Sequence, residues 1–271
     1  MSLDFFKMVA LPELGSTFWI TAVFTVTLIG ISKAGFGSGP GVIATPLLSL
    51  VMPVAAAAAL LLPILLMVDV FVVHQYRREV DAPNLRRLLP GALVGIVLGG
   101  LFFYQFSSNE RVLKVSIGVL AVGFVLYQLM RGRLTRPRPA SRWDSTSPAG
   151  VLVGAFSGFI STLAHVGGPP VVIYLLPQQL PRRLFVGTTA VFFFIVNLIK
   201  LIPYALLGLL VVGNLWMTLL LLPVAVVGVR IGVWLNGRFT DTWFNRVVYV
   251  ILLLVGIQLI LGQSLIGIVL N

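Results

Sequence analysis

The feature that most constrains the fold is a series of apolar stretches long enough to cross a lipid bilayer. A transmembrane helix needs about 20 predominantly apolar residues. Six stretches reach this length: 53–75, 88–106, 112–130, 184–211, 215–235 and 247–269. Two further regions, 15–52 and 148–180, are apolar but are interrupted by glycine and proline clusters, so each predicts a pair of short or broken helices. The sequence therefore predicts an all-α integral membrane protein of eight to ten helical segments.

Composition supports membrane insertion and narrows the functional classes. Only 10% of the residues are charged, whereas soluble domains carry roughly 25%. A net charge of +11 would suggest nucleic-acid binding in a soluble chain, but here most of the basic residues fall in short loops between apolar stretches. The absence of cysteine excludes disulfides, thiolate metal sites and cysteine nucleophiles. We therefore expect the lipid bilayer, and no nucleic acid, as a partner.

The basic residues are distributed very unequally when alternate loops are placed on alternate sides of the membrane. One side receives thirteen of them, and the other receives only Lys7 and Arg111. Because basic residues accumulate in cytoplasmic loops, the rich side is predicted to be cytoplasmic and both termini to lie outside. The thirteen residues are Arg77, Arg78, Arg86, Arg87, Arg131, Arg133, Arg136, Arg138, Arg142, Arg182, Arg183, Arg238 and Arg246.

The sequence divides into two halves of similar length that share motifs. The membrane halves 1–131 and 148–271 are joined by a polar linker, 132–147, which the predicted orientation places in the cytoplasm. Each half holds about five segments, and because five is odd, the second half must enter the membrane from the opposite side. The sequence therefore predicts two inverted repeats, a construction in which transporters place the substrate site between broken helices near the midplane. The shared motifs are Gly30-Ile31-Ser32 before Gly39-Pro40, repeated as Gly158-Phe159-Ile160-Ser161 before Gly168-Pro169, and Leu89-Pro90 with Gly95 and Gly99, repeated as Leu222-Pro223 with Gly228 and Gly232.

The two glycine-rich breaks form the predicted substrate site. Backbone N–H groups at a helix start attract anions, and Lys33 adds a positive charge. His165 adds a side chain that can exchange a proton near neutral pH. Three alternatives stay open: the glycines only allow close helix packing, Lys33 extends to the membrane surface, or His165 only joins two helices. The predicted substrate-binding residues are Ser32, Lys33, Gly35, Gly37, Ser38 and Gly39 in the first break, and Ser161, Thr162, His165, Gly167 and Gly168 in the second.

Polar residues inside other segments form a second predicted group, with a role in proton or charge coupling. Asp69 is a carboxylate in mid-segment, where it is costly unless it is paired or protonated. A shift of 128 residues places Asn197 at the equivalent position of the second half. Lys200 and Arg230 are the candidates for the counter-ion of Asp69 or for part of an anion site, and a purely structural ion pair is the alternative. These four residues and His165 make up the predicted coupling group.

Motifs of soluble enzymes are absent from the sequence. Lys33 stands within the first glycine-rich break, but no Gly-Lys-Ser/Thr sequence ends that break as it does in a phosphate-binding loop. There is no His-Glu-x-x-His motif and no carboxylate cluster for a metal ion. We therefore predict no enzymatic activity, no catalytic residue, no metal and no cofactor.

The motifs resemble those of the TauE/SafE sulfite exporter family over nearly the whole chain. The resemblance rests on Ser32-Lys33-Ala34-Gly35-Phe36-Gly37 with Gly39 and Pro46-Leu47-Leu48, and on Ala164-His165-Val166-Gly167-Gly168-Pro169-Pro170 with Tyr174-Leu175-Leu176-Pro177. It implies export of sulfite or of a small organosulfonate through the inner membrane of a bacterium. The favoured hypothesis is an exporter of a small inorganic or organosulfur anion, with proton coupling as part of it and a homodimer as one allowed assembly. The alternatives are a passive anion channel and a membrane scaffold without transport activity.

Overall fold

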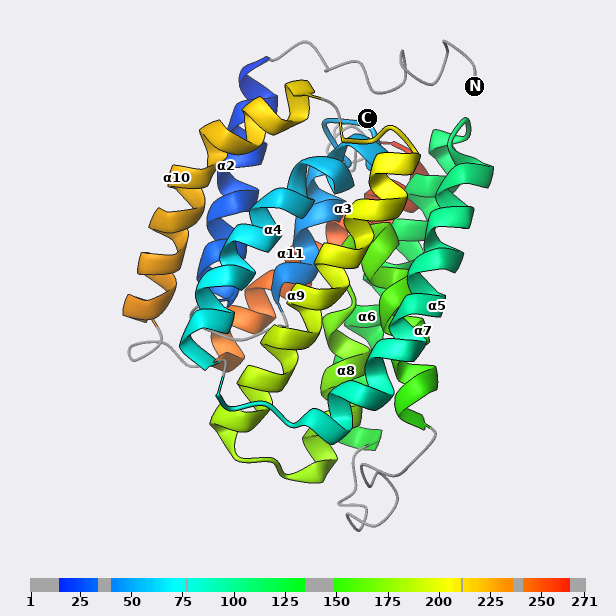
Figure 1. Ribbon diagram of the computed structural model, residues 1–271. Helices are drawn as coiled ribbons and strands as arrows, with labels where there is room; N and C mark the ends of the chain where they lie inside the picture. Colours follow the sequence, from blue (N-terminus) through cyan, green and yellow to red (C-terminus); the bar gives the residue numbers. More distant parts are fainter. Residues whose placement is uncertain are drawn as a thin grey trace.

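The protein is a bundle of helices, shown as a computed structural model in Figure 1. The structure describes residues 15–33, 40–76, 78–134, 149–210, 212–235 and 241–263, and within them all regular structure is helical. The predicted all-α fold is therefore confirmed. The helices are α2 (Ser16–Ile31), η2 (Pro40–Ile43), α3 (Ala44–Leu48), α4 (Val54–Tyr76), α5 (Ala82–Phe106), α6 (Glu110–Leu134), α7 (Ala149–Ala164), α8 (Gly168–Leu175), η4 (Leu176–Gln178), α9 (Arg182–Leu206), α10 (Val212–Leu235) and α11 (Asp241–Leu261).

Several of these helices match the length and polarity of a lipid bilayer. Four of them, α4, α5, α6 and α9, are long and apolar enough to cross it, and shorter apolar helices lie in α2, α7, α10 and α11. The outward-facing side chains are apolar as well: Leu206 is 77% exposed, Leu152 73% and Ile20 70%. A water-soluble protein rarely exposes large contiguous apolar patches. These surfaces suit lipid, as expected for a multi-pass membrane protein.

Each of the two regions that the sequence predicts to be broken is a pair of short helices. In the first half, α2 ends at Ile31 and the chain returns through η2 and α3, while residues 34–39 lie outside the described part. In the second half, α7 ends at Ala164 and α8 begins at Gly168. The prediction of interrupted helices is therefore correct for both regions.

Several helix ends differ from the prediction, among them both ends of α11 (Asp241–Leu261, predicted as 247–269). Two of the differences have clear local reasons. The helix α5 begins at Ala82, six residues before the expected start, because the Asp81 carboxylate accepts a hydrogen bond of 2.9 Å from the Asn84 N–H and proline occupies the first turn. The helix α9 ends at Leu206 and not at residue 211. There Gly208 has a φ of 66°, and the two N–H groups after the helix bond back to its last turn. This is a C-terminal Schellman motif, for which glycine is the usual residue.

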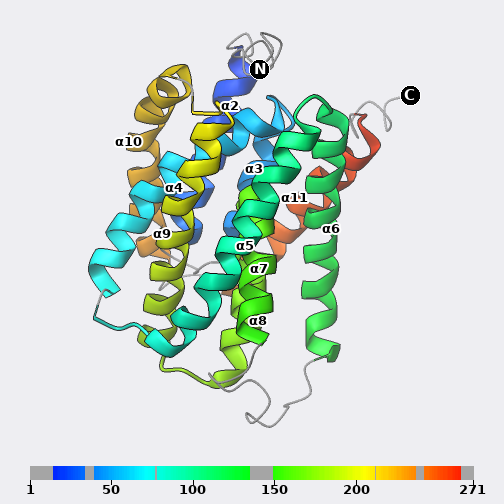
Figure 2. The same cartoon turned by 45° about the vertical axis from the view of Figure 1, so that its right-hand side comes forward.

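The packing of the helices pairs the first half of the chain with the second. Helix α5 packs on α7 and α2 on α10, while α4 packs on α9 and α6 on α11 (Figures 1 and 2). In Figure 1, α4 and α10 run from top to bottom, and α5 and α9 run from bottom to top. The inverted repeat itself stays a prediction here and is taken up below.

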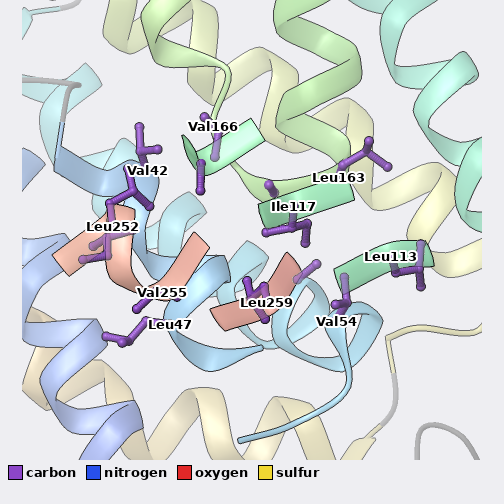
Figure 3. Close-up of a cluster of buried hydrophobic side chains, with 14 of the residues drawn as sticks. Val42, Leu47, Val54, Leu113, Ile117, Leu163, Val166, Leu252, Val255 and Leu259 are labelled. Carbon is purple, nitrogen blue, oxygen red and sulfur yellow. The ribbon is translucent and has the colours of Figure 1, made fainter. Parts of the chain in front are cut away.

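A core of buried apolar side chains holds the two broken regions near the middle of the molecule. Figure 3 shows Val42 and Leu47 from the first region close to Leu252 and Val255 of α11. Leu163 and Val166 of the second region, together with Ile117 of α6, extend the same cluster. Helices α6 and α11 thus cover both breaks from one side.

Candidate functional site

A cavity of about 100 Å³ lies between α4 and α9, beside the end of α2 and the break between α7 and α8. It combines a few polar groups with a largely apolar wall, which is the usual character of a small-molecule site. Its lining residues are Lys33, Leu65, Asp69, Val72, Ser161, His165, Gly168, Phe185, Val186, Thr189, Ala190, Phe193 and Asn197.

The first polar group of the cavity is an ion pair between α2 and α4, with an amide from α9. Lys33 Nζ contacts Asp69 Oδ1, and Asn197 Nδ2 donates a hydrogen bond of 2.6 Å to Asp69 Oδ2. The Asp69 side chain is only 4% exposed, so both of its oxygens are satisfied away from water. The expected counter-ions, Lys200 and Arg230, are therefore not the partners of Asp69; Lys33 takes that place.

The second polar group joins α9 to the second break. Lys200 Nζ donates to Ser161 O at 3.0 Å and to Ser161 Oγ at 3.1 Å, and it lies 2.7 Å from His165 Nδ1. His165 Nε2 in turn lies 2.9 Å from the Ala58 carbonyl oxygen of α4. Lys200 is fully buried, and its three donor hydrogens meet three acceptors near the C-terminus of α7, where the helix dipole also favours a cation.

This arrangement determines which nitrogen of the His165 ring carries the proton. The Ala58 carbonyl can only accept a hydrogen bond, so the Nε2 that faces it must be an N–H. The Lys200 ammonium can only donate, so Nδ1 must offer its lone pair. With Lys200 as the donor to Nδ1, His165 is thus a neutral imidazole that carries its proton on Nε2.

His165 occupies an unusual backbone conformation that orients its ring. Its φ is 55°, in the left-handed region that non-glycine residues rarely adopt, although histidine is among the residues enriched there. The residue ends α7 with its N–H still bonded to Ser161 O, and Ser157 Oγ donates to Gly167 O at 2.7 Å to hold the following turn. A conformation of this kind persists only where the surroundings hold it, and such residues cluster at functional sites.

Comparison with known proteins identifies the family of the chain. The family description "Sulfite exporter TauE/SafE" matches residues 22–259 of the 271. The chain belongs to the TauE/SafE family. No curated protein and no solved structure matches it.

Family membership and the apolar helices agree on the broad class. The TauE/SafE family consists of transporters, so this chain is a multi-pass membrane protein of a transporter family. Among the residues that the structure describes, no three His, Asp or Glu side chains lie close enough together to hold a metal ion.

The predicted substrate residues of this TauE/SafE protein fall into three sets. Lys33, Ser161, His165 and Gly168 line the cavity. Ser32 is 1% exposed, and its hydroxyl has no hydrogen-bond partner among the described residues. Thr162, whose hydroxyl donates to Gly158 O, and Gly167, which precedes α8, do not line the cavity. Gly35, Gly37, Ser38 and Gly39 lie outside the described residues.

The predicted backbone contribution of the second break is smaller than its glycines suggest. Helix α8 starts with Gly168, Pro169 and Pro170. The two prolines have no N–H group, so in this turn only Gly168 and Val171 have N–H groups to offer. In the coupling group, Asp69 and Asn197 line the cavity, Lys200 contacts two lining residues, and Arg230 is exposed on α10 away from it.

The apolar wall of the cavity was not predicted from the sequence. Its residues on α9 are Phe185, Val186, Ala190 and Phe193, and they precede Asn197 at helical spacings of three and four. Following that stripe backwards from Asn197 would have found them.

Proposed function

We propose that this TauE/SafE protein exports a small monovalent anion, either sulfite in its singly charged form or a small organosulfonate. The observation that supports this most strongly is a buried lysine, Lys200, that has no carboxylate partner among the described residues. The charges of Lys33 and Asp69 cancel and His165 is neutral, so a protonated Lys200 would give the described residues of the site a net charge of +1. A buried charge without a counter-ion is costly, and a bound monoanion would supply the counter-ion.

The size and wall of the cavity support a small substrate with some apolar surface. A volume of about 100 Å³ compares with a share of about 30 Å³ per water molecule in the liquid. An anionic head fits between Lys33 and Ser161, where it can accept hydrogen bonds. The rings of Phe185 and Phe193 then face the rest of the substrate, which favours an organosulfonate with a short carbon chain.

Inverted repeats are the proposed architecture, and the helix contacts support them. In this correspondence α2, α4, α5 and α6 of the first half match α7, α9, α10 and α11 of the second. Exchanging the two halves then turns the contact of α5 with α7 into the contact of α10 with α2, and both contacts are present. The contacts of α4 with α9 and of α6 with α11 are each converted into themselves. Each helix also runs opposite to its counterpart in Figure 1, as α4 does to α9. An inverted repeat requires both relations.

Close contacts of single glycines support the same correspondence. A Cβ on Gly95 of α5 would overlap the Ala155 carbonyl oxygen of α7, and a Cβ on Gly228 of α10 would lie 2.6 Å from the Thr27 carbonyl oxygen of α2. Gly228 follows Gly95 by 133 residues, and Ala155 follows Thr27 by 128, so the two halves make one contact twice. Such glycines let membrane helices approach closely.

The proposed orientation places the arginine-rich end in the cytoplasm. Arg86 and Arg87 lie in the first turns of α5 and Arg183 in the first turn of α9, at the lower end in Figure 1. Helix α2 starts and α11 ends at the upper end. Basic residues favour the cytoplasmic face, so the upper end would face outside.

Proton coupling is the proposed use of Asp69. An anion that takes the Lys33 ammonium leaves the Asp69 carboxylate with only the Asn197 amide. Uptake of a proton by Asp69 would neutralise the carboxylate that has lost its ion-pair partner, so the anion and the proton would affect each other's binding. The neutral His165 is the second group that could accept a proton at this site.

The proposal is tested by flux into proteoliposomes that contain the purified protein. Radiolabelled sulfite at pH 6, methanesulfonate and sulfate are compared, each with and without a proton gradient, and protein-free liposomes serve as the control. We expect saturable flux of the two monoanions that exceeds flux of the dianion sulfate, and faster flux with a proton gradient. Flux that a proton gradient leaves unchanged and that never saturates would point to a passive channel, and no flux of any anion would favour a scaffold.

A further inference from the structure

Among the described residues, the lining of the cavity on α4 and α9 extends from the polar groups towards one end of the molecule. On α4 it is lined by residues from Leu65 to Val72, in the second half of the helix, and on α9 by Asn197 and by residues from Phe185 to Phe193, which lie in the first half. These two half-helices meet at the lower, arginine-rich end in Figure 1. The site is therefore reached from that end in this structure.

A shift of 128 residues, which relates α4 to α9 in the proposed inverted repeat, maps the centre of the cavity onto itself. Leu65 maps to Phe193 and Asp69 maps to Asn197, and all four residues line the cavity. These four residues are thus two pairs of equivalent positions, one from each half, and they lie where two symmetry-related routes would meet.

The other lining residues of α4 and α9 map onto residues that are fully buried. Val186 and Thr189 of α9 correspond to Ala58 and Leu61 of α4, both of which are 0% exposed. The same holds for the remaining pairs on these two helices: Phe185 with Ala57, Ala190 with Leu62, and Val72 with Lys200, where the second residue of each pair is also fully buried.

We infer that a second route leads to the same site from the opposite end, closed in this structure and lined by Ala57, Ala58, Leu61, Leu62 and Lys200. The inference rests on the inverted repeat of the proposed function. If the two halves exchange conformations, the residues of the closed route take the places of their counterparts in the open route. Lys200, which is now buried against Ser161 and His165, then faces a water-filled path in the position that Val72 has now.

One hydrogen bond closes the second route at a defined point. His165 Nε2 donates to the carbonyl oxygen of Ala58, the residue that corresponds to the cavity-lining Val186. The bond joins the second break to α4 on the closed route, at the position that corresponds to Val186 on the open route. His165 is therefore a latch on the closed route, and breaking its bond to Ala58 favours the state in which that route is open.

The test uses the absence of cysteine from the sequence, so that single cysteine substitutions report access without background labelling. Leu61→Cys is compared with Leu60→Cys, its matched control. Leu60 is also 0% exposed, but it maps to Thr188, which does not line the cavity. A membrane-impermeant maleimide is added from the face opposite the arginine-rich end. We expect the cysteine at position 61 to react at least 10-fold faster than the one at position 60.

The latch is tested by adding His165→Asn to both single-cysteine chains. Asparagine also tolerates a positive φ, but its side chain is too short to reach Ala58. We expect labelling at position 61 to rise at least threefold further and labelling at position 60 to stay unchanged. If Leu61→Cys prevents folding, Ala57→Cys and its control Ala56→Cys, which is also buried, replace the pair.

Equal labelling of each cysteine and its control, with or without His165→Asn, would overturn the second route. Anion flux through the unlabelled variants separates this result from a failure of the proposed function. Anion flux without selective labelling would support the proposed transport and refute the second route. Selective labelling without flux of any tested anion leaves the route standing and removes the proposed transport.

Discussion

Replacing Lys200 by methionine removes the unbalanced charge of the site and keeps the length of the side chain. Lys200 Nζ lies 3.1 Å from Ser161 Oγ, and Ser161 lines the cavity. An anion that accepts a hydrogen bond from the Ser161 hydroxyl would lie at most about 6 Å from Lys200 Nζ. At an effective dielectric constant of about 20, a charge pair at about 6 Å is worth about 3 kcal/mol, which is about 100-fold in affinity.

Titration calorimetry of the detergent-solubilised protein with methanesulfonate, a permanent monoanion, measures this loss. Lys114→Met is the control of equal charge, because Lys114 pairs with Glu110 at 3.8 Å at the start of α6 and does not line the cavity. We expect Lys200→Met to change the thermal stability little, since a buried methionine needs no counter-ion but the three hydrogen bonds of Lys200 are lost. An affinity for Lys200→Met within threefold of the unchanged protein would refute the assignment of Lys200 as the charge that attracts the anion.

Three further substitutions separate stability from binding. Asn197→Leu leaves Asp69 Oδ2 without its donor, so we expect a loss of about 1–3 kcal/mol in a thermal unfolding assay and weaker anion binding. Tyr204→Phe removes a buried hydrogen bond of 2.7 Å to Thr162 O, and neither residue lines the cavity, so about 1 kcal/mol of stability should be lost while anion binding stays unchanged. Gly208→Ala strains a φ of 66° and should cost about 1–2 kcal/mol without altering flux; an unchanged melting temperature would contradict the role of Gly208 in ending α9.

The sequence predicted the helices well because the membrane imposes one length and one polarity on each of them. Both interrupted regions were also found, since glycine and proline clusters inside apolar stretches have few other uses. The ends of helices were less accurate. The cap formed by Asp81 with the proline after it marks the start of α5, and Gly208 marks the end of α9, but both signals are local and lie outside the hydropathy pattern.

The site could be predicted only in part, because pairing between distant helices is a property of the packed bundle. Asp69 was found from its place in an apolar segment, and Asn197 from the repeat. The candidates for the counter-ion of Asp69 were Lys200 and Arg230, but the structure places Lys33 there, at the end of α2. Lys200 is close to Asn197 in sequence, yet it lies on the side of α9 that faces Ser161. Helix rotation and crossing decide such partners, and neither follows from the order of residues.

The proposed charge of +1 at the empty site would make the unloaded protein the voltage-sensitive form. In the proposed function a bound monoanion would cancel the charge of Lys200, so the site loaded with the anion alone would carry no net charge. The empty site is drawn back towards the negative cytoplasmic face, by up to about 2.3 kcal/mol for each 100 mV. The resting potential of the cell would then drive net movement of the anion outwards.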